Sequence, residues 1–315
     1  MTFVPVSAVI ATKDRPAALA RALRSLLAST AVPAEFVIVD ASADPGAARA
    51  IHAIFDTLRE CPRIIVQSAA TTGAAAQRNQ AVALAGQDYV LFCDDDIICQ
   101  PDCIERLWNA VRADATIGGA SAAIVNQSYA RPGFLMRAAV TILGEPEGEG
   151  YAGRIVGPAI AFLPQLPAAD AAAPDTVPVQ WLNTTCVLYR RQAMPDPPFD
   201  PFFRGYSIGE DIALSLRVAR KARLVNVPGA RIHHDSQPGA HKAQGVARSR
   251  MEIVNRHCIM TRVMGKGRWS DAARMVLWEG CQLAICAVQQ RGGVLFWRAL
   301  WGKLLGLRDI AQRRR

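Results

Sequence analysis

The stretch Asp88-Tyr89-Val90-Leu91-Phe92-Cys93-Asp94-Asp95-Asp96 decides the fold of this 315-residue chain. Its apolar centre has the composition of a short, fully buried strand, and it ends abruptly in three carboxylates. Adjacent unpaired acids are too costly to place in a core, so we expect them at the carboxyl end of the strand. In open α/β sheets, that edge is where ligands bind.

The three acids predict a metal site. Asp94 and Asp96 are two positions apart, so in extended geometry both side chains project to the same side and can share one divalent cation. Mg²⁺ typically takes one or two carboxylates and completes its shell with water and substrate phosphates. The first hypothesis is therefore a nucleotide diphosphate held through a metal ion. A solvated charge run, or a turn before a helix whose N-terminus favours negative charge, stays open as an alternative. A calcium loop does not fit, since its glycine and terminal glutamate are missing.

Strand and helix patterns alternate on both sides of this stretch. Four alternations before residue 115 predict an α/β fold with a mostly parallel sheet flanked by helices. The chain then becomes irregular over residues 126–180. The expected strands are 6–11, 36–39, 63–66, 88–92, 120–125, 181–189 and 224–227, and the expected helices begin near Pro16, Ile51, Gly73, Pro101 and Glu210.

Composition favours a globular protein with an acidic partner. The chain is 51% apolar and 20% charged, and its formal net charge of +9 favours nucleotide phosphate or anionic lipid. No interleaving of aromatic and basic residues points to nucleic acid. Cys99 and Cys103 lie at helical spacing without a matching second pair, so we expect all eight cysteines to be reduced thiols of a cytoplasmic protein. Neither a signal peptide nor an apolar run of ~18 residues is evident, which also favours the cytoplasm.

Five motifs follow one another with strand–helix–strand spacing between them. They are ATKDR (11–15), VDASAD (39–44), Arg78-Asn79 ahead of CDDD (93–96), GED (209–211) and His233-His234. In this order they resemble family 2 glycosyltransferases, over roughly residues 5–240. The resemblance implies the GT-A fold, with a nucleotide-binding sheet in a catalytic domain at residues 1–245. Its donor half would span about 1–125 and its acceptor half about 126–245.

The resemblance also implies a role for each matching position. Asp94 and Asp96 match the metal-binding pair, and one of His233 and His234, with His234 preferred, matches a position that often completes the metal site. Asp211 matches the base that activates the acceptor, with Glu210 beside it. Donor contacts are implied for Thr12, Asp14, Arg15, Asp40, Arg78, Asn79, Asp94 and Asp95, and acceptor contacts for Trp181 and Asn183.

Simpler interpretations of these residues remain. Asp14 can cap the helix that follows it, and Arg78 can be a solvated helix residue. Glu210 and Asp211 can complement a helix dipole. Trp181 can be a core residue.

The implied reaction moves a sugar, as in a hexosyltransferase, from a nucleotide-diphosphate donor to a glycan or lipid-linked acceptor. Mg²⁺ or Mn²⁺ stabilises the leaving group, and a single displacement inverts the anomeric carbon. No QxxRW run connects the chain to the processive, membrane-spanning synthases. A sugar nucleotidyltransferase is one alternative, although it needs a glycine-rich phosphate loop that ATKDRP lacks. A catalytically silent nucleotide-sugar-binding or scaffold subunit is the other.

Residues 246–315 predict a helical appendage, with helical patterns at 251–264, 275–288 and 294–307. Trp297 and Trp301 alternate with basic residues, which suits an amphipathic helix in the interface of an anionic membrane. Packing on the catalytic domain or an oligomer contact is the alternative. We therefore expect a protein peripheral to the inner face of the cell membrane, acting in surface-polysaccharide or glycolipid assembly. Deleting residues 270–315 should move it from the membrane pellet to the supernatant.

Overall fold

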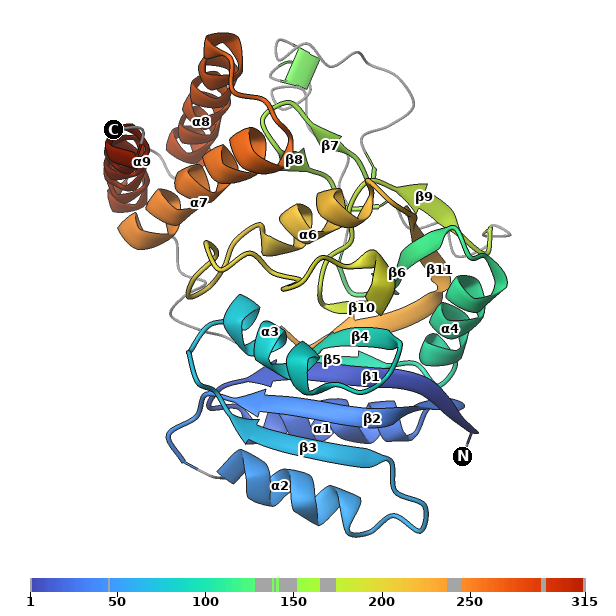
Figure 1. Cartoon of the computed structure of the whole chain (residues 1–315). Coiled ribbons are helices and arrows are strands. Elements are labelled where there is room, and N and C mark those ends of the chain that lie inside the picture. The colour runs from blue at the N-terminus through green and yellow to red at the C-terminus, as the bar shows by residue number, and fades with distance from the viewer. Residues whose placement is uncertain are drawn as a thin grey trace. The chain divides into compact units, whose positions relative to one another are not determined.

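The computed structural model describes residues 2–44, 46–127, 138, 140, 141, 152–164, 174–236, 245–289 and 293–313. Its contacts divide the chain into two compact units (Figure 1). Unit 1 joins Met1–Tyr129 to Pro164–Gln237, and unit 2 joins Ala130–Leu163 to Pro238–Arg315. The division into donor half, acceptor half and appendage stays a prediction.

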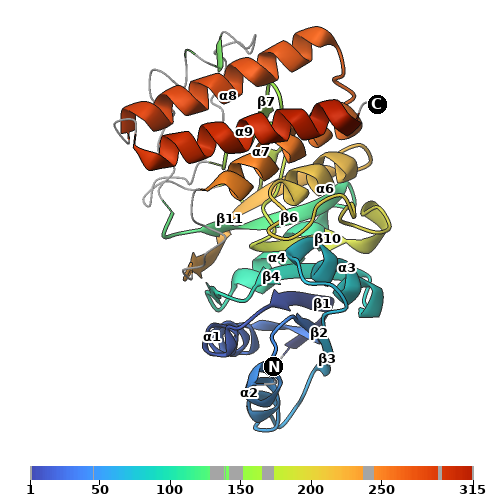
Figure 2. The ribbon, with the colours of Figure 1, turned by 90° about the vertical axis from the view of Figure 1, so that its left-hand side faces the viewer.

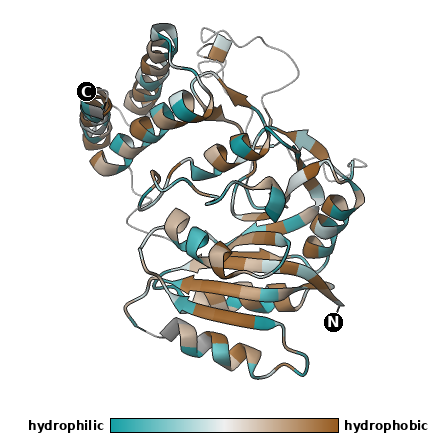
Figure 3. Cartoon of the chain, in the orientation of Figure 1, coloured by the Kyte–Doolittle hydropathy of each residue, from teal (hydrophilic) through white to brown (hydrophobic). Residues whose placement is uncertain are grey.

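Unit 1 is built on one large sheet. Its strands follow the order β3 (Arg63–Ser68), β2 (Ala31–Asp40), β1 (Thr2–Thr12), β4 (Tyr89–Asp94), β10 (Cys186–Arg190), β6 (Ile117–Ile124), β11 (Arg223–His234) and β5 (Ile97–Cys99), and β9 (Val177–Val179) pairs with β11. The first four strands are parallel, as apolar runs buried on both faces predict. β10 lies antiparallel between β4 and β6. Figure 3 shows the hydrophobic residues concentrated on the strands.

Helices cover both faces of this sheet: α1 (Pro16–Leu27), α2 (Gly46–Phe55), α3 (Ala74–Leu84), α4 (Cys103–Ala113) and α6 (Glu210–Val218). Figure 2 shows α1 on one side of the strands and α3 on the other. The side chains of Leu19, Leu23 and Leu26, at helical spacing in α1, are fully buried. The predicted mostly parallel α/β sheet flanked by helices is thus confirmed.

Three local predictions differ from the structure. Asp14 does not cap α1: the N-cap is Arg15, without a side-chain cap bond, and Asp14 has a left-handed backbone with φ 55°. The strand expected at 181–189 begins only at Cys186, and β5 is too short for an alternating pattern to reveal. In the stretch expected to be irregular, β9 and the hairpin of β7 (Ile155–Val156) and β8 (Ile160–Ala161) form where the structure describes it.

Unit 2 is mainly helical, with α7 (Val246–Cys258), a π-helical turn at Ile259–Val263, α8 (Trp269–Gln289) and α9 (Val294–Arg313). At Gly302 a Cβ atom would lie 2.4 Å from the carbonyl oxygen of Val246, so α7 and α9 can approach closely only because glycine stands there. Buried Glu279 of α8 accepts hydrogen bonds from Arg256 of α7, at 2.8 Å, and from Lys303 of α9. Among the residues that the structure describes, no helix is long and apolar enough to cross a membrane.

Candidate active site

The carboxylates at the end of β4 meet a histidine from β11. The ligand atoms of Asp94, Asp96 and His234 all lie within 4.8 Å of one another. Asp94 ends the strand and residues 95–96 form a turn, so the expected extended geometry between Asp94 and Asp96 is wrong. The turn nevertheless brings the carboxylates of Asp94 and Asp96 close together. Antiparallel pairing of β5 with β11 then places His234 opposite Ile97 and beside Asp96. Two carboxylates and an imidazole suit Mn²⁺ or Mg²⁺ in chemistry and charge.

The imidazole of His234 is held on both sides. Its Nε2 lies 3.1 Å from Asp96 Oδ1, and its Nδ1 lies 3.2 Å from the side-chain nitrogen of Gln127. A terminal amide can present either nitrogen or oxygen to Nδ1, so Gln127 is able to support the tautomer that frees Nε2 for a metal. Asn126 exchanges two 2.9 Å hydrogen bonds with the His234 backbone. His233 points to the other face of the strand and is exposed.

Asp95 lies between Asp94 and Asp96 in the sequence. It is buried and binds side chains of the loop after β1. Thr12 Oγ1 donates to Asp95 Oδ2 at 2.7 Å, and Arg15 Nη1 donates to Asp95 Oδ1 at 3.1 Å and to Asp96 Oδ2 at 3.4 Å. Burial raises the pKa of Asp95 to about 6, although the Thr12 hydrogen bond and the Arg15 charge oppose the rise. Thr12 and Arg15 therefore lie against the carboxylate turn.

Arg78 of α3 joins two groups of carboxylates. Its guanidinium is buried, with Nη2 2.7 Å from Asp94 Oδ1 and Nη1 2.9 Å from Glu210 Oε1. Arg78 Nε is buried too, and no described residue accepts its hydrogen. Arg78 is thus not the solvated helix residue of the alternative interpretation.

A close backbone contact sets α3 beside the segment that leads to α6. Gly73 has φ 143°, a conformation that favours glycine, and an added Cβ would lie 3.1 Å from the nitrogen of Gly205. The N–H of Ala74 donates to the Gly205 carbonyl at 3.3 Å. The contact brings the helix of Arg78 next to the residues that precede the GED motif.

Glu210 and Asp211 open α6 behind left-handed Gly209, whose φ is 87°. Burial and the charge of Asp211 raise the pKa of Glu210, in spite of its Arg78 partner. Burial also raises the pKa of Asp211 to about 6. Asp211 Oδ1 accepts the backbone N–H of Ile212 at 2.8 Å. Both acids lie in the first helical turn, so the dipole interaction and a chemical role are compatible.

Three further residues predicted to contact the donor, Asp14, Asp40 and Asn79, form hydrogen bonds within the protein. Asp40 Oδ1 accepts the backbone N–H of Ser42 at 2.8 Å, and Ser42 Oγ accepts the Asp14 N–H at 2.6 Å, which ties together the loops after β1 and β2. Asn79 bonds the backbone of Phe199 through both its amide nitrogen and its amide oxygen, at 2.7 and 2.9 Å, so it positions that segment.

Of the two residues predicted to contact an acceptor, Trp181 is buried, which suits a core residue. Asn183 Oδ1 is buried without a hydrogen-bond partner among the described residues. The assignment of every site residue stays a prediction.

Gln77, which sequence reasoning missed, organises the edge of the sheet. Its buried amide nitrogen donates to the carbonyls of Thr12 and Val39, both at 2.9 Å, and its oxygen accepts the Gly73 N–H at 3.2 Å. It thereby joins the ends of β1 and β2 to the start of α3. No sequence signal separates it from a solvated helical glutamine.

Comparisons with known proteins concern the sequence and the fold. Residues 7–142 match the sequence profile described as Glycosyl transferase family 2. A curated relative, the uncharacterized glycosyltransferase YwdF of Bacillus subtilis (strain 168), is 32% identical over 102 residues. That alignment covers 32% of this chain and 36% of the relative, so the chain spans only about a third of that protein's length.

Two solved structures share the fold at low sequence identity. GalNAc-T7 with UDP, GalNAc and Mn²⁺ has a TM-score of 0.57 at 15% identity, over 79% of this chain and 47% of that one. The mannosyltransferase PcManGT from Pyrobaculum calidifontis, in complex with GDP-Man and Mn²⁺, has a TM-score of 0.55 at 14% identity, over 97% and 87%. The chain thus has the GT-A fold, and its residues 7–142 are similar to glycosyltransferase family 2.

Proposed function

We propose that this protein is an inverting, metal-dependent glycosyltransferase of the hexosyltransferase type. It would move a sugar from a nucleotide-diphosphate donor to a glycan or lipid-linked acceptor. The observation that carries the proposal is the pair of acidic groups, Asp94–Asp96 with His234 and Glu210–Asp211, bridged by buried Arg78. The related folds above were solved with nucleotides or nucleotide sugars and Mn²⁺, which supports a donor of that class.

Each acidic group has its own task in this proposal. Asp94, Asp96 and His234 would hold Mn²⁺ or Mg²⁺, which when bound stabilises negative charge on the departing diphosphate. Asp211 accepts the proton of the acceptor hydroxyl as that hydroxyl attacks the anomeric carbon. Arg78 holds Asp94 and Glu210 in position, with its two terminal nitrogens 2.7 and 2.9 Å from their carboxylate oxygens. A single displacement inverts the anomeric centre.

The donor would lie along the loops after β1, β2 and β4. Thr12, Asp14, Arg15 and Asp40 contact it, while Asp95 holds the loop after β1 in place through Thr12 and Asn79 positions the segment at Phe199. On the acceptor side, the unpartnered oxygen of Asn183 beside Trp181 offers a hydrogen-bond acceptor.

The test is turnover of nucleotide sugars with and without metal. Transfer or donor hydrolysis should appear with Mn²⁺ or Mg²⁺ and disappear with a chelator. His234→Ala should weaken Mn²⁺ binding at least about 10-fold, because it removes a metal ligand, whereas the neighbouring exposed His233→Ala should not. Donor binding without turnover would instead indicate a silent subunit. Pyrophosphate release from a nucleoside triphosphate and a sugar phosphate would indicate a nucleotidyltransferase.

The pH profile of transfer tests Asp211. Its pKa is raised to about 6 by burial, and only its charged form can accept a proton. We expect kcat/KM to rise with pH up to about 6 and then to level off. A profile that is already flat from about pH 5 upwards would place the base elsewhere.

For α9 we propose an anionic membrane surface as partner, on the cytoplasmic side where lipid-linked acceptors for surface polysaccharide or glycolipid assembly would be met. Val294, Trp297, Trp301 and Leu304 are 48–66% exposed and recur every three or four residues, and exposed Arg298 and Arg308 accompany them. The opposite face of the helix, with Gly302 and Gly306, packs on α7. An apolar stripe with flanking cations fits an interfacial helix.

Vesicle flotation measures this contact. A Trp297→Gln/Trp301→Gln variant should bind phosphatidylserine-containing vesicles at least about 10-fold more weakly, since two interfacial aromatic side chains are lost. Trp269→Gln is the matched control, because Trp269 is 85% exposed at the start of α8 and lies outside the stripe. Equal binding by all three proteins would contradict the proposal. These substitutions are cleaner than deleting residues 270–315, since that deletion removes buried Trp278 from a cluster with Val140 and Val156.

A further inference from the structure

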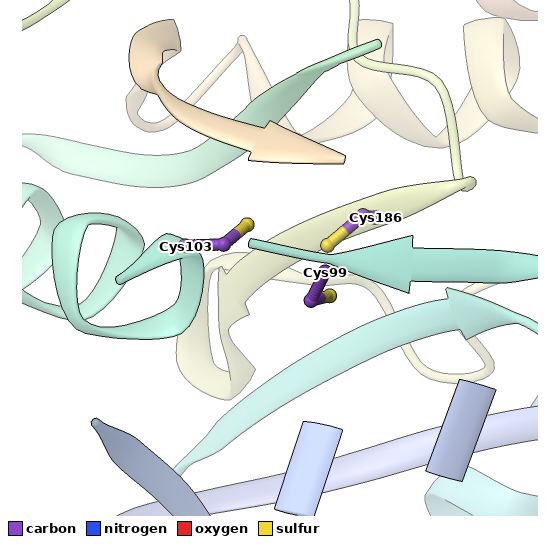
Figure 4. Close-up of side chains that lie close together, drawn as sticks. All are labelled: Cys99, Cys103 and Cys186. Atoms are coloured by element: carbon purple, nitrogen blue, oxygen red, sulfur yellow. The ribbon is translucent and has the colours of Figure 1, made fainter. Parts of the chain in front are cut away.

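Three buried thiols, two of them close in sequence and one far along the chain, meet inside unit 1. The sulfurs of Cys99, Cys103 and Cys186 all lie within 4.8 Å of one another. Figure 4 shows these side chains together: Cys99 ends β5, Cys103 begins α4 and Cys186 begins β10. Each is less than a tenth exposed, and all eight cysteines of the chain are free thiols.

A fourth thiol adjoins this cluster. Strand pairing sets Cys93 of β4 opposite Cys186 of β10, and both are buried. The N–H of Asp94 bonds the Thr185 carbonyl at 3.0 Å, so Cys93 and Cys186 form the adjacent non-hydrogen-bonded pair, whose Cα atoms lie about 4.5 Å apart. Four sulfurs are thus gathered around the start of β10.

The spacing of the three sulfurs suits one metal ion. With Zn–S bonds of about 2.3 Å, two sulfurs of a tetrahedral site lie about 3.8 Å apart. The sulfurs of Cys99, Cys103 and Cys186 are already within 4.8 Å, so a shift of about 1 Å or less would complete the arrangement. Thiolates select soft or borderline ions such as Zn²⁺ and disfavour Mg²⁺ and Mn²⁺. The cluster is therefore chemically distinct from the carboxylate site.

We propose that Cys99, Cys103 and Cys186 bind one thiophilic metal ion, Zn²⁺, inside the sheet, with the thiol of Cys93 alongside. Each ligating thiol releases its proton to solvent as the S–Zn bond forms, and three thiolates around Zn²⁺ leave one net negative charge. The ion would join β5, α4 and β10. Cys99 stands three residues after Asp96, so the ion would also stiffen the strand that follows the carboxylate turn.

Metal content of the whole chain decides the proposal. Protein produced with zinc should carry about one equivalent of Zn²⁺ per chain after a chelator has removed metal from the carboxylate site. Protein produced with cobalt should show thiolate-to-Co²⁺ charge-transfer absorption. Cys186→Ala should lose both signals, while Asp96→Asn and Cys258→Ala should keep both. Cys258 is a matched control because it is equally buried but belongs to unit 2.

Two results would overturn the proposal. One is metal-free protein with all eight thiols titratable after denaturation, which would make the cluster a set of packing thiols. The other is fewer than eight titratable thiols, which would show that a disulfide forms there instead. The wild-type measurements decide between these outcomes even if a variant folds poorly. Zinc binding is independent of sugar transfer, so either proposal can fail without the other.

Discussion

Replacing Asp211 with Asn should lower kcat for sugar transfer by about 10²–10⁴-fold, the range that general-base catalysis contributes. Asn has nearly the same shape, and its oxygen can still accept the Ile212 N–H that Asp211 accepts at 2.8 Å. It cannot take up a proton at neutral pH. The loss should therefore fall on kcat, and donor affinity, measured by calorimetry with the nucleotide and Mn²⁺, should change little.

The control is Asp200→Asn, because Asp200 also accepts a nearby backbone N–H, from Phe202 at 2.9 Å, without belonging to the acidic groups. It should retain wild-type kcat. If Asp211→Asn kept more than about a tenth of the activity, the proton would have another acceptor. The rise of kcat/KM towards pH 6 should also vanish in this variant, a change that a purely structural role would not produce.

Arg78→Leu should be the most destabilising single substitution at the site, lowering the free energy of unfolding by about 3–5 kcal/mol. Leu fills part of the space but leaves Asp94 and buried Glu210 without the cation that lies 2.7 and 2.9 Å from them. Denaturant unfolding measures the change. Transfer activity should fall as well, because Arg78 holds the two acidic groups together.

The pH dependence of the free energy of unfolding shows whether Arg78 stabilises the protein through its charge or only by filling space. Burial already raises the pKa of Glu210 in the folded protein, so ionising it costs stability as pH rises above its unfolded value of about 4.3. The folded pKa of Glu210 is about 8 with Arg78 in place and would rise further without it. The difference between variant and wild type should therefore stay nearly constant up to about pH 8 and increase above it. A difference that is the same at every pH would mean that Arg78 only fills space. Arg49→Leu, which removes an exposed ion pair to Asp44, should change stability by less than about 0.5 kcal/mol.

Local sequence patterns predicted the parts of the fold that depend on neighbours in the chain. Short apolar runs predicted the buried strands, and leucines at helical spacing predicted α1. The carboxyl ends of parallel strands share one edge of the sheet. The sequence alone therefore predicts that this edge carries Thr12, Asp40 and Asp94.

The rest depended on pairing between distant segments. No sequence pattern near Asp96 predicts that residues 95–96 form a turn. Nor does any local pattern predict that the short strand after them pairs with the end of β11, which places His234 beside Asp96. The thiol cluster was missed because the partner of Cys99 and Cys103 comes from Cys186, far along the chain. Gln77 was missed because an amide that bonds three backbone groups looks, in sequence, like any helical glutamine.

The position of β10 has a consequence for synthesis on the ribosome. β4 ends at Asp94, but the strand that covers its free edge begins at Cys186, about 90 residues later. At about 5–20 residues per second, the nascent chain would expose that apolar edge for roughly 5–18 s before β10 emerges. Unpaired edges are prone to aggregation, so slow translation across this interval would raise the demand for chaperones.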